Sequence, residues 1–397
     1  MIEIKPNFQH LSHCPYSGTV LKPVKVLWQG THVCVVSESP DSGEIIEELR
    51  IGHAAKTPYQ IDLAKGAIFS GDKYAEEFLA KPLLNSLENP QLEHLEISQE
   101  IFKSYQRVIV LNCIDYLYGH SLLKLLNAQR HLESNPDLGL IVIVQSFLRW
   151  MVPDGVAEVW TVPISLKNGQ DYYPSFAKFV EKQSQRFEKI YVSEAYSHPS
   201  RFDITQFTRV PKHTFDDHEK VQITFIWRED RLLVNSFLFR VLRKLKLLEI
   251  GLAIQNWKVR HLFDRIRSKL PEAKFVVAGL GTKTKFPQWI EDCRVERFNQ
   301  KTEKETCQIY SKSRLVIGLH GSNMLLPSGL AGMTLDLIEN RWGNFAQDVL
   351  YQETNPRLAS FRYRYLPSQV SADILANIAA QMIQTQSDFY FHTTADE

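Results

Sequence analysis

Four polar residues in the last quarter of the chain, His320, Gly321, Ser322 and Asn323, interrupt two apolar runs. The run before them, 315–319, is Leu-Val-Ile-Gly-Leu, which is typical of a parallel strand buried on both faces. Ligands of open α/β sheets bind at the carboxyl ends of the strands, and a helix that begins there favours an anion. An imidazole, a glycine that allows close backbone approach, a hydroxyl and an amide could together hold a nucleotide. We therefore predict that these four residues contact a nucleotide ligand.

Two arginines follow a second strand-like run and could bind the same ligand. The run at 221–226 alternates bulky apolar residues, and Arg228 and Arg231 come shortly after it. A guanidinium at a strand end could bind a diphosphate through two parallel hydrogen bonds and stabilise it as a leaving group. The alternative is a surface ion pair with Glu229 or Asp230. We predict phosphate contacts for both arginines.

Carboxylates and glycines near two more strand ends complete the predicted binding residues. Asp336 and Glu339 lie along or after the run at 334–339 and could accept hydrogen bonds from ribose hydroxyls. A buried hydrogen-bonding role is an open alternative for Asp336. Gly279, with Gly281 two residues later, resembles a fragment of a glycine-rich phosphate loop, without the complete sequence of such a loop.

The first half of the chain offers candidates for acid–base chemistry. Asp115 and His120 follow the apolar run at 108–111, so both are expected at the carboxyl edge of a sheet. Either side chain could take a proton from a hydroxyl group, and so could Asp154 or Glu194. The sequence does not choose among the four, and His120 could instead stabilise its own loop. We assign Asp115 and His120 as the candidate catalytic pair.

Two sheets are needed to position these residues. Apolar runs alternate with segments of helical spacing in both halves of the chain, which predicts parallel β-α-β units. The predicted strands are 24–28, 31–36, 108–111, 140–144, 157–162, 189–192, 221–226, 274–278, 315–319 and 334–339. The predicted helices are 74–84, 122–132 with Ser121 as N-cap, 173–187, a long helix after 231 that is interrupted at 250–252, 257–270, 301–311 and 371–386.

The chain is long enough for two domains. The polar, proline-punctuated stretch 197–220 is the natural linker between them. We predict an N-terminal Rossmann-like domain at 1–205, with an additional region of unassigned role over about 1–100. We predict a C-terminal Rossmann-like domain at 206–397 that binds the nucleotide.

Composition excludes several classes of function. The net charge of +1 gives no indication of nucleic acid or an anionic membrane as the main partner, although local basic patches are left open. Five dispersed cysteines without a Cys-x-x-Cys pair argue against a disulfide framework and a structural zinc site. We see no apolar signal segment and no uninterrupted apolar stretch of the about 20 residues that would span a bilayer. A cytoplasmic location is the expectation.

The residues around His320 resemble a family signature. An apolar strand, His320-Gly321-Ser322, an apolar helix and a strand with Asp336 resemble the C-terminal half of the family 61 glycosyltransferases. That family carries His-Gly-Ala or a close variant, so Ser322 is a small departure. Asp336 stands where the family usually has Glu. The arginine-containing segment after the preceding strand also looks like a counterpart.

A second, looser match lies in the first half of the chain. Tyr118-Gly119-His120, followed by an apolar helix start, is similar to the aromatic-x-His motif of the N-terminal domain of that family. The resemblance extends over roughly residues 105–345, so the first hundred residues are outside it.

The resemblance implies a fold and a reaction. The fold would be α/β, with two Rossmann-like domains facing across a cleft in the architecture called GT-B. The reaction would move a sugar from a nucleotide-sugar, expected to be a UDP-sugar, to a hydroxyl of a glycan, lipid-linked or protein acceptor, with inversion. No Asp-x-Asp sequence occurs, which favours stabilisation of the leaving group without a metal or other cofactor.

Such an enzyme would serve bacterial surface polysaccharide synthesis, and peripheral membrane contact is left open. The alternatives are a fucosyltransferase-like enzyme that uses a GDP-sugar and a non-catalytic module that binds nucleotide-sugars.

Overall fold

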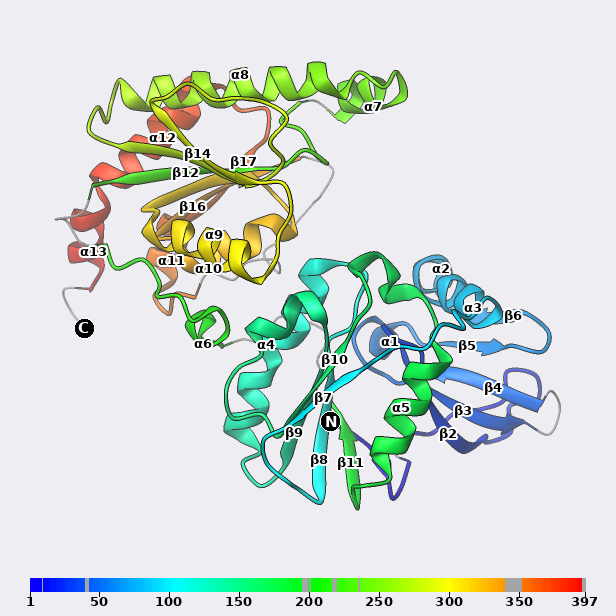
Figure 1. Cartoon of the computed structure of the whole chain (residues 1–397). Coiled ribbons are helices and arrows are strands. Elements are labelled where there is room, and N and C mark those ends of the chain that lie inside the picture. Colours follow the sequence, from blue (N-terminus) through cyan, green and yellow to red (C-terminus); the bar gives the residue numbers. More distant parts are fainter. Residues whose placement is uncertain are drawn as a thin grey trace. The chain divides into compact units, whose positions relative to one another are not determined.

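The chain forms two compact units, Met1–Phe207 and Thr208–Glu397, each of which is described by itself. A computed structural model describes residues 1–8, 10–39, 43–194, 199, 201–215, 220–234, 236–339 and 352–394 (Figure 1). None of the helices described there is both long and apolar enough to cross a membrane.

The second unit is built on one six-stranded sheet in the order β14-β13-β12-β15-β16-β17. All five strand pairs are parallel. Numbered along the chain, the order is 3-2-1-4-5-6, which is the order of a dinucleotide-binding Rossmann sheet. The strand order therefore reverses between β12 and β15. The strands are β12 (Gln222–Trp227), β13 (Lys274–Leu280), β14 (Ile290–Val295), β15 (Leu315–Leu319), β16 (Met333–Ile338) and β17 (Tyr363–Pro367).

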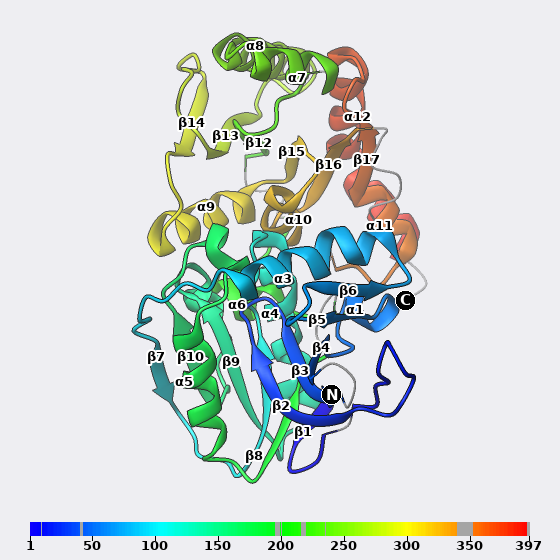
Figure 2. The ribbon, with the colours of Figure 1, turned by 90° about the vertical axis from the view of Figure 1, so that its right-hand side faces the viewer.

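Helices cover both faces of this sheet. Helices α8 (Leu248–Arg267) and α12 (Ala372–Gln384) pack on one face, and α9 (Gln300–Lys312) and α10 (Leu325–Leu330) on the other (Figures 1 and 2). Because both faces are covered, every residue of β12 and β15 is buried, which explains their uninterrupted apolar sequences. Asn299 begins α9 with a capping box.

The first unit contains a second Rossmann-like sheet, in the order β1-β11-β8-β9-β10-β7. Its four central strands are parallel, and the two edge strands run antiparallel to their neighbours. The reversal of strand order lies between β8 and β11. Helix α4 (Tyr118–Ser134) packs against β8 and β9. The strands are β1 (Ile2–Lys5), β7 (Ser98–Ile101), β8 (Arg107–Asn112), β9 (Gly139–Gln145), β10 (Glu158–Val162) and β11 (Lys189–Val192). Helix α5 is Pro174–Ser184.

Residues 22–70 contain a separate antiparallel meander within the first unit. Its order, β2-β3-β4-β5-β6, follows the chain, and its predicted strands 24–28 and 31–36 are confirmed as β2 and β3. The bounds are β2 (Lys22–Trp28), β3 (Val33–Ser39), β4 (Gly43–Glu48), β5 (Tyr59–Asp62) and β6 (Ala67–Ser70). Its helical segments are α1 (His53–Lys56), α2 (Lys73–Ala75), the π-helical η1 (Glu76–Ala80) and α3 (Lys81–Glu88).

The fold class is therefore α/β with two Rossmann-like sheets, as predicted. Two details of the helices are corrected. Ser121 is not an N-cap, because α4 begins at Tyr118 and the buried Ser121 hydroxyl lies 3.4 Å from Gln145 Oε1. The expected interruption at 250–252 lies inside α8, where a Cβ on Gly251 would come 2.5 Å from Leu232 Cδ1.

Candidate functional site

The residues predicted to bind a nucleotide meet at the carboxyl ends of β12 and β15. Arg228 follows the last residue of β12, and His320 follows the last residue of β15. The two strands are hydrogen-bonded neighbours in parallel register, and the strand order reverses between them. This switch point is where open α/β sheets bind their ligands.

Both arginine side chains are fixed to the loop that follows β15. Arg228 Nη1 donates to Asn323 Oδ1, and Arg231 Nη1 donates to the His320 carbonyl at 2.8 Å. Arg228 also makes a two-pronged pair with the exposed Asp230 through Nε (2.8 Å) and Nη2 (2.5 Å). The pair with Asp230, which the sequence had left as an alternative, therefore exists beside the contact to the predicted binding loop.

Gly321 lies close to both guanidinium groups. A Cβ at this position would stand 3.1 Å from Arg228 Nη1 and 3.5 Å from Arg231 Nη1. Its φ of 140° is one that residues with a side chain rarely adopt. Ser322 is exposed and opens the short helix η4 (Ser322–Met324), which leads into the six-residue α10. Helix α10 has only six residues, so its dipole adds little at this edge.

A buried hydrogen-bond network fixes the ring of His320. Its Nδ1 lies 2.8 Å from Asp336 Oδ2, and the same oxygen accepts a hydrogen bond from the Tyr363 hydroxyl at 2.6 Å. Asp336 is fully buried and His320 is 4% exposed. Burial, and then the charge of Asp336, raises the pKa of Tyr363 far above its usual range. The Tyr363 hydroxyl and the His320 ring therefore meet at one oxygen of Asp336, so this side chain orients the imidazole, which is the buried role left open by the sequence.

Gly279, within β13, and Gly281, just after it, have packing explanations. A Cβ on Gly279 would overlap the Trp227 carbonyl of the neighbouring strand, and one on Gly281 would overlap the Glu229 side chain. Glu339 lies one residue beyond β16 and is half-buried. Phosphate contact by Gly279 and ribose contact by Glu339 stay predictions.

Sequence reasoning missed two residues that shape this edge. Tyr363, the first residue of β17, completes the network below His320. Gln255 of α8 accepts from the Leu233 amide at 2.7 Å and donates to the Arg228 carbonyl at 2.9 Å, so it fixes the arginine loop. The alternation Tyr363-Arg364-Tyr365 could have indicated the strand, whereas nothing in the sequence marks Gln255.

The first unit brings its predicted pair together with a lysine. The buried Asp115 carboxylate pairs with Lys124 Nζ at 2.9 Å and with His120 Nδ1 at 3.5 Å, and it accepts from the Leu117 amide at 3.0 Å. Burial would raise the pKa of Asp115, but the charge of Lys124, aided by His120, outweighs this and holds the pKa well below its usual range. The His120 side chain is 37% exposed, so the histidine rather than the aspartate can meet a ligand.

A third histidine belongs to the surroundings of this cluster. His53 on α1 makes an edge contact with the Tyr74 ring at 5.6 Å between centroids. Burial lowers the pKa of His53, and the charge of His120 lowers it further, while Asp115 acts in the opposite direction. The additional N-terminal sheet region thus contributes a titratable group beside the candidate catalytic pair.

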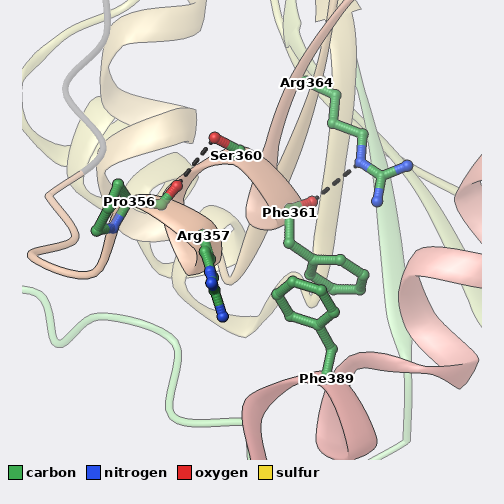
Figure 3. A pocket seen from close by; sticks show the side chains of 6 residues that line it. All are labelled: Pro356, Arg357, Ser360, Phe361, Arg364 and Phe389. Atoms are coloured by element: carbon green, nitrogen blue, oxygen red, sulfur yellow. Dashed lines mark hydrogen bonds between the residues drawn. The ribbon is translucent and has the colours of Figure 1, made fainter. Parts of the chain in front are cut away.

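A shallow pocket of about 460 Å³ lies elsewhere in the second unit, between α11 (Pro356–Arg362) and α13 (Gln386–Thr394). Figure 3 shows the stacked rings of Phe361 and Phe389, with Arg364 Nε donating to the Phe361 carbonyl. Arg364 is near the amino end of β17, whereas His320 follows the carboxyl end of β15. The pocket is therefore separate from the switch point. Its lining residues are Pro356, Arg357, Ser360, Phe361, Arg364 and Phe389.

The described part of the chain holds no group of three or more His, Cys, Asp or Glu side chains placed to bind a metal ion. No protein family matches the sequence, and no curated protein matches it.

Several solved structures show distant similarity. A protein from Listeria monocytogenes assigned as a UDP-N-acetylglucosamine 2-epimerase is 9% identical, with a TM-score of 0.28 over 67% of this chain and 64% of its own. Accessory secretory proteins 1, 2 and 3 of Streptococcus pneumoniae give 8% identity and a TM-score of 0.31 over 98% of this chain and 66% of theirs. The GtfA/B complex gives 11% identity and a TM-score of 0.24 over 94% and 78%. This chain spans just under two thirds of the first two proteins. The fold class rests on the topology of the two sheets and not on these similarities.

Proposed function

We propose that the chain is a glycosyltransferase that moves a sugar from a nucleotide-sugar to an acceptor hydroxyl. The main support is the convergence of two guanidinium groups on Gly321 at the switch point of a Rossmann-like sheet. A glycine close to two guanidinium groups suits the close approach of a diphosphate. The resemblance to family 61 glycosyltransferases, carried by His320-Gly321-Ser322 and Asp336, supports the same assignment.

In this proposal the second unit binds the donor. Arg228 and Arg231 bind the diphosphate and stabilise the negative charge that develops as the sugar leaves. The buried His320 shapes the donor site through its carbonyl, which accepts from Arg231, and its ring is held by Asp336 and Tyr363. Because two arginines can neutralise the leaving group, the proposed reaction needs no divalent metal. A UDP-sugar is the proposed donor.

The first unit supplies the base. The acceptor oxygen bonds to the anomeric carbon as the bond from that carbon to the diphosphate oxygen breaks, and this inverts the configuration. The acceptor proton passes to His120, and the diphosphate leaves with the bonding electrons.

His120 is the proposed base because it is partly exposed, whereas Asp115 is buried in a pair with Lys124. Asp115 acts by positioning the imidazole. This division of roles matches the GT-B architecture, in which one domain binds the donor and the other the acceptor, and a bacterial surface polysaccharide is the proposed product.

The donor site is tested by calorimetry with UDP and GDP on the wild type and on Arg228→Ala. Loss of a charge-assisted contact to phosphate, about 1.5–3 kcal/mol, should weaken binding about 10- to 100-fold. Arg357→Ala, in the pocket of Figure 3, is the control and should bind like the wild type. Equal affinities in Arg228→Ala and the wild type would remove the donor assignment.

His120→Ala distinguishes an enzyme from a non-catalytic binding module. In an enzyme, the variant should bind the nucleotide normally and lose at least about 100-fold in transfer rate, because general base catalysis contributes that much. A wild-type protein that binds the nucleotide-sugar but transfers nothing to any glycan, lipid-linked or protein acceptor would support the module instead.

A further inference from the structure

An exposed surface of mixed apolar and basic character covers one end of the second unit. It is formed by α7 (Ser236–Lys244), the turn after it and the first part of α8. In both views these two helices lie next to each other (Figures 1 and 2). The exposed apolar side chains are Phe237, Leu245, Leu247, Ile250 and Trp257, between 43% and 68% exposed. The exposed basic side chains are Arg240, Arg243, Lys244, Lys246 and Arg260. We call these ten residues the apolar–basic surface.

The surface is presented by a fixed scaffold. The opposite side of α7 packs inward through Phe239 and the buried Leu242. In the turn after α7, Lys246 has a left-handed conformation, φ 58°, and the Leu247 amide donates to the Leu242 carbonyl at 2.8 Å. Glycine normally occupies such a position, and a lysine there costs about 1 kcal/mol of backbone strain. The turn therefore projects Leu245, Lys246 and Leu247 outward together.

The spacing on α8 continues the same surface. Ile250 and Trp257 are seven residues apart in the sequence, so they project from one side of the helix. The Trp257 ring stacks on His261 with centroids 5.3 Å apart and an angle of 5° between the planes. Tryptophan is typical of the boundary between water and a lipid bilayer. Single exposed apolar residues are ordinary, whereas a contiguous set marks an interaction surface.

The charges decide which partner fits. Between residues 236 and 261 the only carboxylate is Glu249, against the five exposed cations, although the whole chain has a net charge of +1. Lysine is depleted at the centre of protein–protein interfaces, whereas arginine and aromatic residues are enriched there, so Lys244 and Lys246 argue against a protein partner. Apolar side chains interleaved with lysine and arginine are instead characteristic of helices that lie in the headgroup region of an anionic bilayer.

We propose that the apolar–basic surface binds the headgroup region of an anionic lipid bilayer. Phe237, Leu245, Leu247 and Trp257 enter the boundary of the acyl chains, and the five cations remain among the anionic headgroups. Binding is peripheral and reversible. This proposal does not depend on the proposed glycosyltransferase activity, because it concerns the affinity of the surface for lipid.

The location of the surface has one consequence for the substrate. Helix α7 is joined to β12 by the loop that contains Arg228 and Arg231, so lipid contact would hold the donor edge of the second unit close to the bilayer. If the proposed function is right, the acceptor is a lipid-linked molecule rather than a free glycan or protein.

The test is sedimentation of the full chain with vesicles. Phosphatidylcholine vesicles containing phosphatidylglycerol should bind the wild type, and vesicles of phosphatidylcholine alone should bind it far more weakly. Binding should become weaker as the salt concentration rises from about 0.05 M to about 0.5 M, because salt screens the charges. Arg243→Gln/Lys244→Gln should weaken partitioning about 25-fold, since each cation near an anionic surface contributes about fivefold. Phe237→Ser should weaken it about tenfold.

Matched controls lie on other helices of the same unit. Phe391 on α13 is 66% exposed, close to the 68% of Phe237, and Phe391→Ser should bind vesicles like the wild type. Lys301→Gln/Lys304→Gln on α9 removes two exposed cations from the opposite face of the sheet and should also have little effect. Equal vesicle binding by the surface variants and their controls would overturn the proposal. The proposal would also be overturned if the wild type does not bind vesicles and self-associates through Phe237, because the surface would then bind a second copy of this chain.

Discussion

The two Rossmann-like sheets place polar residues at equivalent positions and use them differently. Each has its candidate residues after a strand at the point where the strand order reverses, β8 in the first unit and β12 in the second. In the second unit, two guanidinium groups lie close to a glycine, and the buried acid, Asp336, supports a histidine and accepts from Tyr363. In the first unit, the buried acid, Asp115, is paired with Lys124, and only His120 is substantially exposed.

This difference shows how one topology can serve two kinds of chemistry. Arginines around an open backbone position attract an anion and keep their charge at any physiological pH. A histidine backed by an ionised carboxylate can instead accept a proton near neutral pH. Both groups of candidate residues occupy the same position in their sheets. They differ in the residue that pairs with the buried acid, and this partner determines which chemistry the sheet edge can perform.

The largest expected effect comes from breaking the pair in the first unit. Lys124→Met leaves Asp115 buried without its main counter-charge and removes the hydrogen bond from Lys124 Nζ to the Ile114 carbonyl. Removing one member of a buried ion pair should lower the free energy of unfolding by about 3–5 kcal/mol, measured by urea denaturation at pH 7.5. Lys25→Met, which removes an exposed pair with Glu44, is the control and should change little.

The pH dependence of this variant provides a second measurement. The folded-state pKa of Asp115 lies below its unfolded value of about 3.9, so the pair stabilises the fold above that pH and loses its effect as pH falls through the folded pKa. Without Lys124, burial raises the pKa of Asp115, and the variant takes up a proton at a higher pH than the wild type. The stability difference should therefore shrink from pH 8 to pH 5. A difference that stays constant over this range would show that the charge of Asp115 is not its cause.

A smaller effect is expected at the glycine of the second unit. Gly321→Ala places a methyl group 3.1 Å from Arg228 Nη1 on a backbone with φ 140°, so it should displace the guanidinium and strain the loop. We expect about tenfold weaker binding of UDP by calorimetry, with a stability loss of about 1–3 kcal/mol. Gly18→Ala in the first unit is matched for backbone strain, because its φ is 74° with nothing within 4 Å of the new methyl. Gly18→Ala should lower the stability and leave the affinity for UDP unchanged. Equal losses of UDP affinity in both variants would show that Gly321 does not contact the ligand.

The strands that are covered on both faces of the two Rossmann-like sheets were predicted from the sequence. The apolar runs at 108–111 and 315–319 are confirmed as β8 and β15, because strands covered on both faces leave no room for polar residues. The edge strands β1, β7, β14 and β17 of the two Rossmann-like sheets were missed. For example, β14 has the sequence Ile-Glu-Asp-Cys-Arg-Val, in which polar residues interrupt the apolar pattern because the edge of the sheet is partly exposed.

The same limit applies to the candidate site. The convergence of Arg228 with Gly321 follows from two strand ends being neighbours, which the β-α-β pattern predicts. The contact from Tyr363 to Asp336 requires the pairing of β16 with β17, and the role of Lys124 requires its position one turn beyond His120 on α4 with the side chain directed at Asp115. Such contacts depend on tertiary packing, so residue types and spacing alone do not reveal them.

The smallest expected effect tests whether the N-terminal sheet region takes part in the chemistry of the first unit. The charge of His120 lowers the pKa of His53, after the larger effect of burial, and Asp115 raises it. His120→Ala should therefore raise the pKa of His53 measured by NMR titration, and Asp115→Asn should lower it. The lowered pKa makes protonation of His53 unfavourable in the folded state, so its contribution to stability declines as pH falls below about 6.5, and His120→Ala should reduce that decline. His131, with a pKa lowered to about 4 by burial and then by Arg130, is the internal control and should not respond to either variant. If His53 titrates identically in the wild type and both variants, it lies outside the electrostatic reach of the Asp115–His120 pair, and the additional N-terminal sheet has no direct part in proton transfer.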